Sequence, residues 1–355
     1  MKKELRLMKG NEAVAEAAIR AGADGYFGYP ITPQSEILEY LMEANPGETT
    51  GMVVLQAESE VAAINMVYGG AACGKKVMTS SSSPGISLKQ EGITYIAGAE
   101  LPCLIVNVVR GGPGLGTIQP AQSDYFQATK GGGHGDYHLL VLAPASVQEM
   151  ADFVELGFDL AFKYRNPVMI LSDGAIGQMM EKVWLKPQKK RSEEILPWAT
   201  TGKPASRERN IITSLDLDPG RQEQFNLKLI AKYREMEENE VRFEEFMTDD
   251  AEYLFVAYGT SARLCQKALQ LARAEGIKAG LLRPITLFPF PKKRLNELAG
   301  SVKGMLAVEM SAGQMVEDVM LSVCGKTRVS HYGRMGGMIP TPEEVVENLK
   351  SFIKG

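Results

Sequence analysis

Six short apolar segments alternate with helix-like segments over the first half of this 355-residue chain. Apolar runs of this kind, bounded by Gly, Pro or polar residues, are typical of β-strands. Because helical patterns separate most of them, the strands are predicted to be parallel and covered by helices on both faces. The segments are residues 24–29, 52–56, 75–80, 101–109, 138–142 and 167–172.

Capping residues predict where three of the helices begin. Asn11 is expected to cap the first helix, and Thr32 the second, with Pro33 as that helix's first residue. Near the C-terminus, Thr341 is expected to cap the last helix, with Pro342 as its first residue. Thr32 directly follows a predicted strand, so its side chain could also face a ligand, and the local sequence leaves both readings open.

The second half of the chain divides into two further parts. Residues 186–249 are polar and aperiodic at first, and then contain a charged segment with apolar residues at helical spacing, which predicts a linker and an exposed helix. A second, smaller α/β unit begins near Asp250. The predicted domains are therefore residues 1–185, the linker 186–249 and residues 250–355. The apolar positions of the linker helix are Phe225, Leu229, Tyr233 and Met236.

Charge and hydropathy exclude two classes of partner. The net charge of −4 disfavours nucleic acid, which requires a basic face. No apolar run reaches the roughly 20 residues that span a bilayer. The N-terminal MKKELRLMKG lacks the apolar core of a signal peptide. These features predict a cytoplasmic protein that binds neither nucleic acid nor membrane.

Metal-ligating residues are few and scattered. The four cysteines form no CxxC pair, which disfavours a disulfide framework or an iron–sulfur cluster held by this chain. With only three histidines, a His-rich metal site is also disfavoured. No metal site is predicted here, and any metal or redox centre is expected on another chain. These residues are Cys73, Cys103, Cys265, Cys324, His134, His138 and His331.

The candidate site lies in the loops that follow the first four strands, because ligands bind at the carboxyl ends of parallel strands. These loops contain Thr32, Glu60, the hydroxyl run 79–83 and Arg110. Each has a structural alternative. Glu60 also suits the positive end of a helix, and the hydroxyl run also suits a turn. Arg110 needs an anionic partner, which is either a protein carboxylate or a ligand.

The glycine-rich run GGPGLG at 111–116 does not have the GxGxxG spacing of a dinucleotide-binding loop. The residues alone therefore indicate a two-domain α/β protein with a polar site above its first sheet.

Taken together, the four loops resemble the alpha subunits of the 2-oxoacid:ferredoxin oxidoreductases, most closely the 3-methyl-2-oxobutanoate (2-oxoisovalerate) type. The likeness extends from about Lys9 to Met180 and resumes in three later segments. The loop motifs are YPITPQSEI, LQAESEVAAINMVYGGAACG, MTSSSSPGISLKQEGITYIAGAELP and VRGGPGLGTIQPAQSDYFQATKGGGHGD. The later segments are YLFVAYGTSAR, EMSAGQMVEDV and GRMGGMIPTPEEV.

The resemblance implies a thiamine diphosphate enzyme that oxidatively decarboxylates a 2-oxoacid, acylates coenzyme A and reduces ferredoxin. It implies a parallel-sheet pyrimidine-binding domain, followed by a linker and a doubly wound domain like the transketolase C-terminal domain. This chain lacks the family's GDG…N diphosphate motif and its cysteine clusters. Mg²⁺ and iron–sulfur clusters are therefore expected on partners, and the chain should be inactive alone. The implied partners are a beta subunit carrying the diphosphate motif, a gamma subunit, a small ferredoxin-like subunit and ferredoxin itself.

The resemblance also implies roles for individual residues. Glu60 matches the carboxylate that hydrogen-bonds N1′ of the pyrimidine, which favours the 4′-imino tautomer that deprotonates the thiazolium carbon. Thr32 matches a threonine that faces the substrate, and Arg110 an arginine that pairs with the 2-oxoacid carboxylate. Leu115 replaces a hydroxyl-bearing position of 2-oxoglutarate-type subunits, which favours an aliphatic substrate. Ser82, Ser83 and Gly85 are expected to line the cofactor cavity.

The sequence leaves three alternatives open. The chain could be a 2-oxoglutarate- or pyruvate-type member of the same family. It could be a component of a lipoamide-linked 2-oxoacid dehydrogenase, which shares the chemistry but not these loop sequences. It could also be a non-catalytic α/β assembly protein that has kept the fold.

Overall fold

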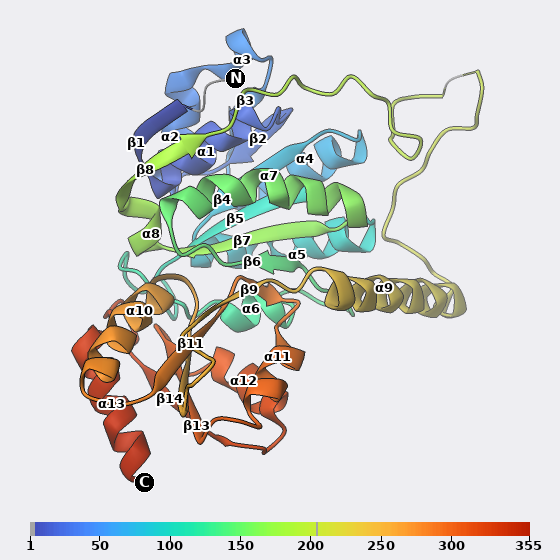
Figure 1. Ribbon diagram of the computed structural model, residues 1–355. Coiled ribbons are helices and arrows are strands. Elements are labelled where there is room, and N and C mark those ends of the chain that lie inside the picture. Colours follow the sequence, from blue (N-terminus) through green and yellow to red (C-terminus); the bar gives the residue numbers. More distant parts are fainter. Residues whose placement is uncertain (1–3, 204) are drawn as a thin grey trace.

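The computed structural model describes residues 4–203 and 205–355 and contains two large sheets, each covered by helices (Figure 1). The first sheet has the strand order β12-β6-β7-β5-β4-β2-β3. All six predicted strands are present and pair in parallel, which confirms the predicted α/β architecture. They are β2 (Gly25–Gly28), β3 (Val53–Gln56), β4 (Val77–Ser81), β5 (Cys103–Val109), β6 (Leu140–Leu142) and β7 (Pro167–Asp173).

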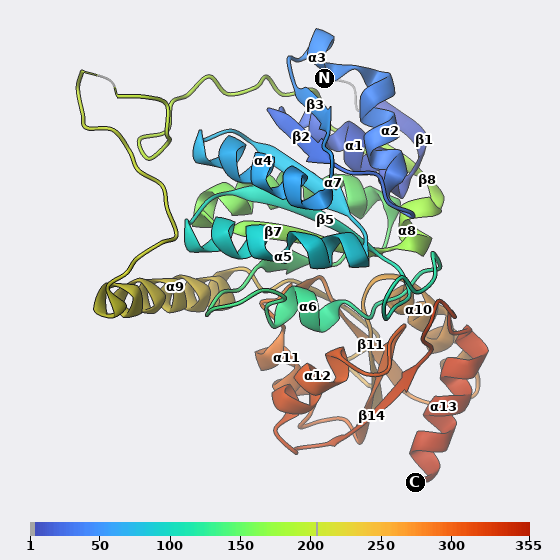
Figure 2. The same ribbon diagram turned by 180° about the vertical axis from the view of Figure 1, so that it is seen from behind.

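Helices cover both faces of this sheet. α1 (Gly10–Arg20) packs against α7 (Val147–Tyr164), and α4 (Glu60–Ala72) packs against α5 (Ser83–Gly98). α7 lies in front of the strands in Figure 1, whereas α4 and α5 lie in front after the half-turn of Figure 2. The central strands β4, β5 and β7 are buried along their whole length, as expected for a sheet covered on both sides. Shorter helices complete this unit: α2 (Ser35–Ala44), α3 (Pro46–Thr49), α6 (Tyr125–Thr129) and α8 (Gly174–Gln178).

Two of the three predicted helix caps are wrong. α1 begins at Gly10 with Lys9 as its N-cap, because the Asn11 amide is used elsewhere and donates to the Pro33 carbonyl at 2.7 Å. α2 begins at Ser35 with Gln34 as its N-cap, two residues later than predicted. Residues 31–34 form a separate turn, closed by a 2.9 Å hydrogen bond from the Gln34 N–H to the Ile31 carbonyl.

The third cap is confirmed. α13 (Pro342–Lys354) starts after Thr341, whose hydroxyl accepts a hydrogen bond from the Glu344 N–H. The Glu344 carboxylate in turn accepts from the Thr341 N–H at 2.9 Å, which completes a capping box.

A two-stranded ribbon was not predicted. β1 (Glu4–Lys9) pairs antiparallel with β8 (Met180–Leu185), so the start of the chain lies beside a segment about 175 residues further on. Both strands carry exposed apolar side chains, and only Met8, Val183 and Leu185 are buried.

The predicted linker is extended at first and helical later. The described residues between Leu185 and Pro219 contain no helix or strand, and α9 (Pro219–Asn239) follows. Leu229, Tyr233 and Met236 face the core, as their spacing predicted, while Phe225 is only partly buried. Figures 1 and 2 show the extended stretch looping away from the body before α9 returns to it.

The second sheet has the order β14-β13-β10-β11-β9. Its strands β10, β11, β13 and β14 are parallel, and β9 joins as an antiparallel edge strand. The strands are β9 (Phe243–Phe246), β10 (Tyr253–Val256), β11 (Ala279–Pro284), β13 (Gly304–Glu309) and β14 (Arg328–Gly333). The other helices of this unit are α10 (Gly259–Ala274), α11 (Lys292–Leu298) and α12 (Met315–Val323).

The two units share structure. β12 (Thr286–Phe288) leaves the second unit and pairs antiparallel with β6 at the edge of the first sheet. The fully buried Gln122 side chain donates to the Tyr258 carbonyl and accepts from the Ser261 hydroxyl. One hydrophobic cluster contains residues from both sheets, including Val106, Val256 and Met305.

Candidate functional site

The loops that follow β2, β3, β4 and β5 lie together above the carboxyl ends of the strands of the first sheet, because these strands are parallel. α8, which follows β7 without a break, marks the carboxyl ends of the strands in Figure 1. The structure brings the predicted site residues together here in two clusters. One contains Glu60 and the serine run, and the other is centred on Arg110.

Glu60 is the first residue of α4. The Ser59 hydroxyl caps the helix by accepting from the Ala62 N–H at 3.2 Å. This cap places the Glu60 side chain in the first turn of the helix, at the positive end of its dipole. The side chain is buried, and it forms no hydrogen bond within the described part of the chain. Its neighbour Glu58 points into solvent.

Gly85 makes room for the Glu60 carboxylate. A Cβ atom on Gly85 would lie 2.8 Å from Glu60 Oε1 and 2.1 Å from Ser81 Oγ, so no other residue fits without displacing both groups. The predicted cofactor-lining residue Gly85 therefore lies directly against Glu60, with Ser81 beside them.

The serine run is buried and incompletely bonded. The Ser81 and Ser82 hydroxyls have no hydrogen-bond partner among residues 4–203 and 205–355. A buried hydroxyl without a partner costs about 1–3 kcal/mol. Two such groups beside an unbonded carboxylate form a cradle that a polar ligand would complete. Ser83 differs, because its hydroxyl donates to the Arg110 carbonyl at 3.2 Å and accepts from the Arg110 N–H at 3.1 Å.

Arg110 connects the predicted substrate residues. Its Nη1 donates to the Thr32 carbonyl and its Nη2 to the Leu115 carbonyl, both at 3.0 Å. Its Nε is buried without a partner, and no carboxylate of the described residues lies within ion-pair distance of the guanidinium. The charge of Arg110 is therefore available to an anionic ligand. The sequence left open whether the anionic partner of Arg110 is a protein carboxylate or a ligand. The described part of the chain supplies no such carboxylate.

Thr32 and Leu115 lie at the outer rim. The Thr32 side chain lines an open cleft of about 660 Å³ with Ile118, Gly174 and Ile339. Leu115 is 82% exposed on the loop that Arg110 holds. Both residues contribute backbone carbonyls to Arg110 and present side chains to the surface of this chain.

Sequence reasoning missed a polar network beneath the site. The Tyr26 and Ser80 hydroxyls lie 2.7 Å apart, and the Ser80 hydroxyl donates to Gln34 Oε1 at 2.6 Å. Gln34 Nε2 donates to the Tyr29 carbonyl, so the network fixes the turn that contains Thr32. Lys89 was missed too, although it lies four residues after Gly85 on the same face of α5, a spacing visible in the sequence.

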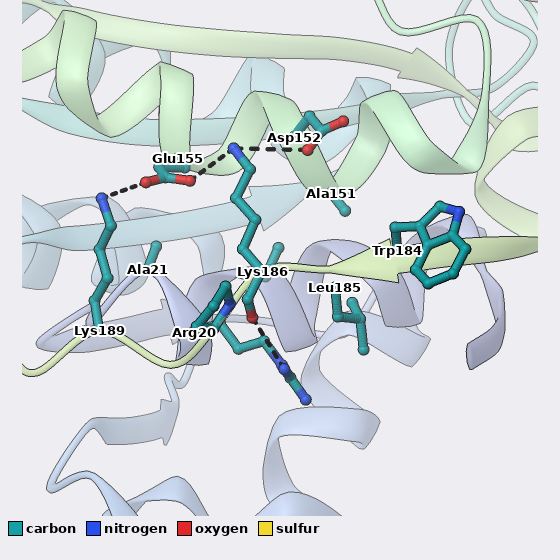
Figure 3. Close-up of a pocket in the computed structure, with 11 residues that line it drawn as sticks. Arg20, Ala21, Ala151, Asp152, Glu155, Trp184, Leu185, Lys186 and Lys189 are labelled. Carbon is teal, nitrogen blue, oxygen red and sulfur yellow. Dashed lines mark hydrogen bonds and ion pairs between the residues drawn. The ribbon is translucent and has the colours of Figure 1, made fainter. Parts of the chain in front are cut away.

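A small pocket elsewhere does not join the site. It lies between α1, α7 and β8 and has a volume of about 20 Å³ (Figure 3). Lys186 reaches across it to Glu155 at 2.7 Å and Asp152 at 3.6 Å. Its charges are therefore paired with one another, and it lies in the layer of α1 and α7 rather than at the carboxyl edge of the sheet.

The described chain offers no group of three or more His, Cys, Asp or Glu side chains arranged to hold a metal. The four cysteines are free thiols. No helix in the described ranges is long and apolar enough to cross a membrane.

Comparison with protein families gives two matches. Residues 16–248 match the family described as pyruvate flavodoxin/ferredoxin oxidoreductase, thiamine diphosphate-binding. Residues 251–345 match the core domain II of pyruvate:ferredoxin oxidoreductase.

Curated relatives align over nearly the whole chain. The chain is 52% identical to ketoisovalerate oxidoreductase subunit VorB of Methanothermobacter thermautotrophicus, over 97% of each chain. It is 37% identical to 2-oxoglutarate synthase subunit KorA of Methanothermobacter marburgensis, over 96% of this chain and 97% of that one.

Solved structures are similar as well, among them the two that follow. A 2-oxoglutarate:ferredoxin oxidoreductase from Magnetococcus marinus, with 2-oxoglutarate, coenzyme A and succinyl-CoA bound, superposes with a TM-score of 0.88 at 29% identity. The match covers 99% of this chain and 66% of that longer chain. A split-gene transketolase has a TM-score of 0.61 at 14% identity and is similar in fold alone.

Proposed function

Because the chain belongs to the pyruvate flavodoxin/ferredoxin oxidoreductase family, we propose that it is the alpha-type subunit of a 2-oxoisovalerate:ferredoxin oxidoreductase. The assembled enzyme would oxidatively decarboxylate 2-oxoisovalerate, transfer the acyl group to coenzyme A and reduce ferredoxin. The higher identity to the ketoisovalerate oxidoreductase subunit than to the 2-oxoglutarate synthase subunit supports this substrate. The aliphatic Leu115, in place of a hydroxyl, supports it as well.

The observation that carries the proposal is the buried, unbonded Glu60 carboxylate at the start of α4. Such a group, nearly enclosed and without a hydrogen-bond partner among the described residues, is left to bond with a ligand or a partner subunit. The Gly85 gap and the free hydroxyls of Ser81 and Ser82 surround it with further polar groups that lack partners. The donors and acceptors present therefore fit a flat, polar ring such as the aminopyrimidine of thiamine diphosphate.

When bound, thiamine diphosphate supplies the nucleophilic carbon and the electron sink that decarboxylation of a 2-oxoacid requires. In this chain, Glu60 would hold a proton in a hydrogen bond to N1′ of the pyrimidine. Ser82, Ser83 and Gly85 would shape the wall against which the ring rests. Ser83 would also keep Arg110 in place through its two backbone hydrogen bonds.

Arg110 would bind the carboxylate of the 2-oxoacid. Its guanidinium already lies between Thr32 and Leu115, so a carboxylate at Arg110 would be flanked by both residues. Thr32 would line the substrate pocket, and Leu115 would contact an aliphatic side chain.

The remaining parts of the enzyme would come from other chains. A beta subunit would bind the diphosphate and Mg²⁺, a small ferredoxin-like subunit would carry iron–sulfur clusters, and a gamma subunit would complete the complex. Ferredoxin would be the electron acceptor, coenzyme A the acyl acceptor, and the cytoplasm the site of action.

The test is Glu60→Gln in the assembled complex, with 2-oxoacid-dependent reduction of viologen as the assay. We expect activity to fall by about 10²-fold or more, because a positioned proton-transfer group contributes roughly that much. Glu58→Gln is the matched control. It removes an exposed carboxylate two residues earlier and should leave the rate nearly unchanged.

Substrate choice is tested on the same complex with 2-oxoisovalerate, 2-oxoglutarate, pyruvate and an aryl pyruvate. The proposal expects the highest kcat/KM for 2-oxoisovalerate. A preference for 2-oxoglutarate or pyruvate would reassign the substrate within the family. Normal turnover in Glu60→Gln would refute the role of Glu60. A complex that reduces no acceptor with any 2-oxoacid would refute the enzymatic function itself.

A further inference from the structure

Lys89 is a fully buried lysine in the middle of α5. Its Nζ donates to the Thr79 hydroxyl at 2.7 Å and to the Ser80 carbonyl at 3.2 Å. Within the described residues it forms no ion pair with a carboxylate. An apolar side chain of the same length would fill this space without the cost of burying an ammonium. The position therefore calls for an explanation beyond packing.

The acidic group that acts on Lys89 is Glu60. Gly85 lies one helical turn before Lys89 on the same face of α5, and Glu60 Oε1 lies 2.8 Å from the point where a Gly85 Cβ would be. Burial lowers the pKa of Lys89 to about 7, and the attraction of Glu60 partly opposes that shift. The two groups are thus an acid and a base in one buried cluster.

Other charges near this end of α5 are engaged or exposed. β4 contributes only the neutral groups of Thr79 and Ser80. Asp124 hydrogen-bonds to Asn107, and its pKa is raised by burial. Arg110 faces the carbonyls of Thr32 and Leu115.

We propose that Lys89 is a positioning residue whose buried ammonium keeps the Glu60 carboxylate ionised until the ligand binds. This inference rests on the proposed role of Glu60. Lys89 also donates to the Ser80 carbonyl near the end of β4. The same side chain therefore supplies the positive charge near Glu60 and fixes the position of the β4 backbone beside it. As the pH rises past neutrality the ammonium loses its proton, and its support of Glu60 ends.

The first test is the pH profile of kcat/KM in the assembled complex. Removing the ammonium lets Glu60 take up its proton at a higher pH, so in Lys89→Met the acidic limb should move up by about one pH unit. At a fixed pH on that limb this equals a loss of about ten-fold. Lys76→Met is the matched control, because Lys76 lies at the opposite end of β4 and donates to Ala21.

Lys89→Gln separates charge from hydrogen bonding. Glutamine can retain a bond to the Thr79 hydroxyl but carries no charge, so the proposal expects it to move the acidic limb as far as Lys89→Met does. A shift in the Met variant alone would assign Lys89 to hydrogen bonding and overturn the proposal. An unshifted profile in both variants would overturn it as well.

Binding gives a readout that does not depend on turnover. The affinity of the complex for thiamine diphosphate, measured by calorimetry without 2-oxoacid, should show the same upward shift of its acidic limb in both variants. If neither variant assembles, the wild-type full chain still provides a test. Its ¹³Cε-lysine NMR signals should include one that titrates near neutral pH, and the absence of such a signal would overturn the proposal.

The outcome is separable from the proposed function. If Glu60→Gln is inactive while the Lys89 variants keep the wild-type profile, the inference about Lys89 fails and the role of Glu60 stands. If Glu60→Gln is active, the role of Glu60 fails first.

Discussion

Arg110 forms structural hydrogen bonds and is also the proposed ligand of the substrate carboxylate. Its two terminal nitrogens bind backbone carbonyls that lie 78 and 5 residues away in sequence, yet its charge has no carboxylate partner in the described structure. Backbone carbonyls satisfy its hydrogen-bonding geometry but do not neutralise it. In the proposed function, this guanidinium would bind the carboxylate of the substrate.

We predict that Arg110→Leu raises KM for the 2-oxoacid by about 10- to 100-fold, since a hydrogen bond to a charged group is worth about 1.5–3 kcal/mol. Steady-state kinetics of the assembled complex measure this. Arg110→Lys keeps the charge but loses the two-pronged hydrogen-bonding geometry of the guanidinium. Its KM should therefore lie between those of the wild type and Arg110→Leu. Unchanged KM in both variants would make Arg110 a purely structural residue.

At the scale of single elements, α5 contains both a glycine that must stay small and a lysine that must stay buried. Gly85→Ala should destabilise the chain by about 1–3 kcal/mol, because overpacked positions cost that much and the new Cβ meets Ser81 and Glu60. It should also lower activity by displacing Glu60. Urea unfolding measures the first effect and viologen reduction the second.

Gly69→Ala in α4 is the matched control for Gly85→Ala. It is also a helical glycine, but a Cβ there meets no atom within 4 Å. Alanine stabilises an open helical position by up to about 1 kcal/mol over glycine. The two substitutions are therefore expected to change stability in opposite directions. A stabilised Gly85→Ala variant with normal activity would contradict the cradle at Glu60.

Elements set by their own sequence were predictable, and elements set by distant partners were not. The segments 101–109 and 167–172 are apolar except for Asn107 and Ser172, so their burial follows from their composition. The caps at Asn11 and Thr32 were mispredicted because the Asn11 amide serves a tertiary contact and residues 31–34 close a turn of their own. Neither the contact of Asn11 nor the turn at residues 31–34 can be predicted from the neighbouring sequence.

The same distinction holds at the site. The loops could be located from the strand order alone, whereas the roles of Glu60 and Arg110 are implied by the family resemblance and stay predictions. The network of Tyr26, Ser80 and Gln34 joins residues up to 54 positions apart and required the structure.

For the whole molecule, the connection between the two units is the main departure from the expected organisation. β12 is a three-residue strand followed by Pro289, too short and interrupted to be assigned to a particular sheet from sequence. In the structure it extends the first sheet, and with the Gln122 contacts it ties the units together. The two units are therefore expected to unfold in one cooperative transition.

Thr260→Val tests that cooperativity. The buried Asp173 carboxylate at the end of β7 accepts from the Thr260 hydroxyl at 2.8 Å and the Thr260 N–H at 3.3 Å. Valine is nearly isosteric but leaves the carboxylate one donor short, so the free energy of unfolding should fall by about 1–3 kcal/mol. Thr49→Val, at an exposed position in α3, should change it little.

The fluorescence of the two tryptophans follows the unfolding of the first unit and the linker separately from that of the second unit. Trp184 lies in β8 and Trp198 in the linker, so their fluorescence reports on parts of the chain outside the second sheet, whereas circular dichroism reports on both units. Because the hydrogen bond between Thr260 and Asp173 joins the two units, a tryptophan midpoint that shifts together with the dichroism midpoint in Thr260→Val means that the units unfold together. We expect the fluorescence and dichroism midpoints to coincide in the wild type and to move down together in the variant. A biphasic dichroism curve with an unmoved tryptophan midpoint would instead mean that Asp173 and Thr260 join two units that unfold separately.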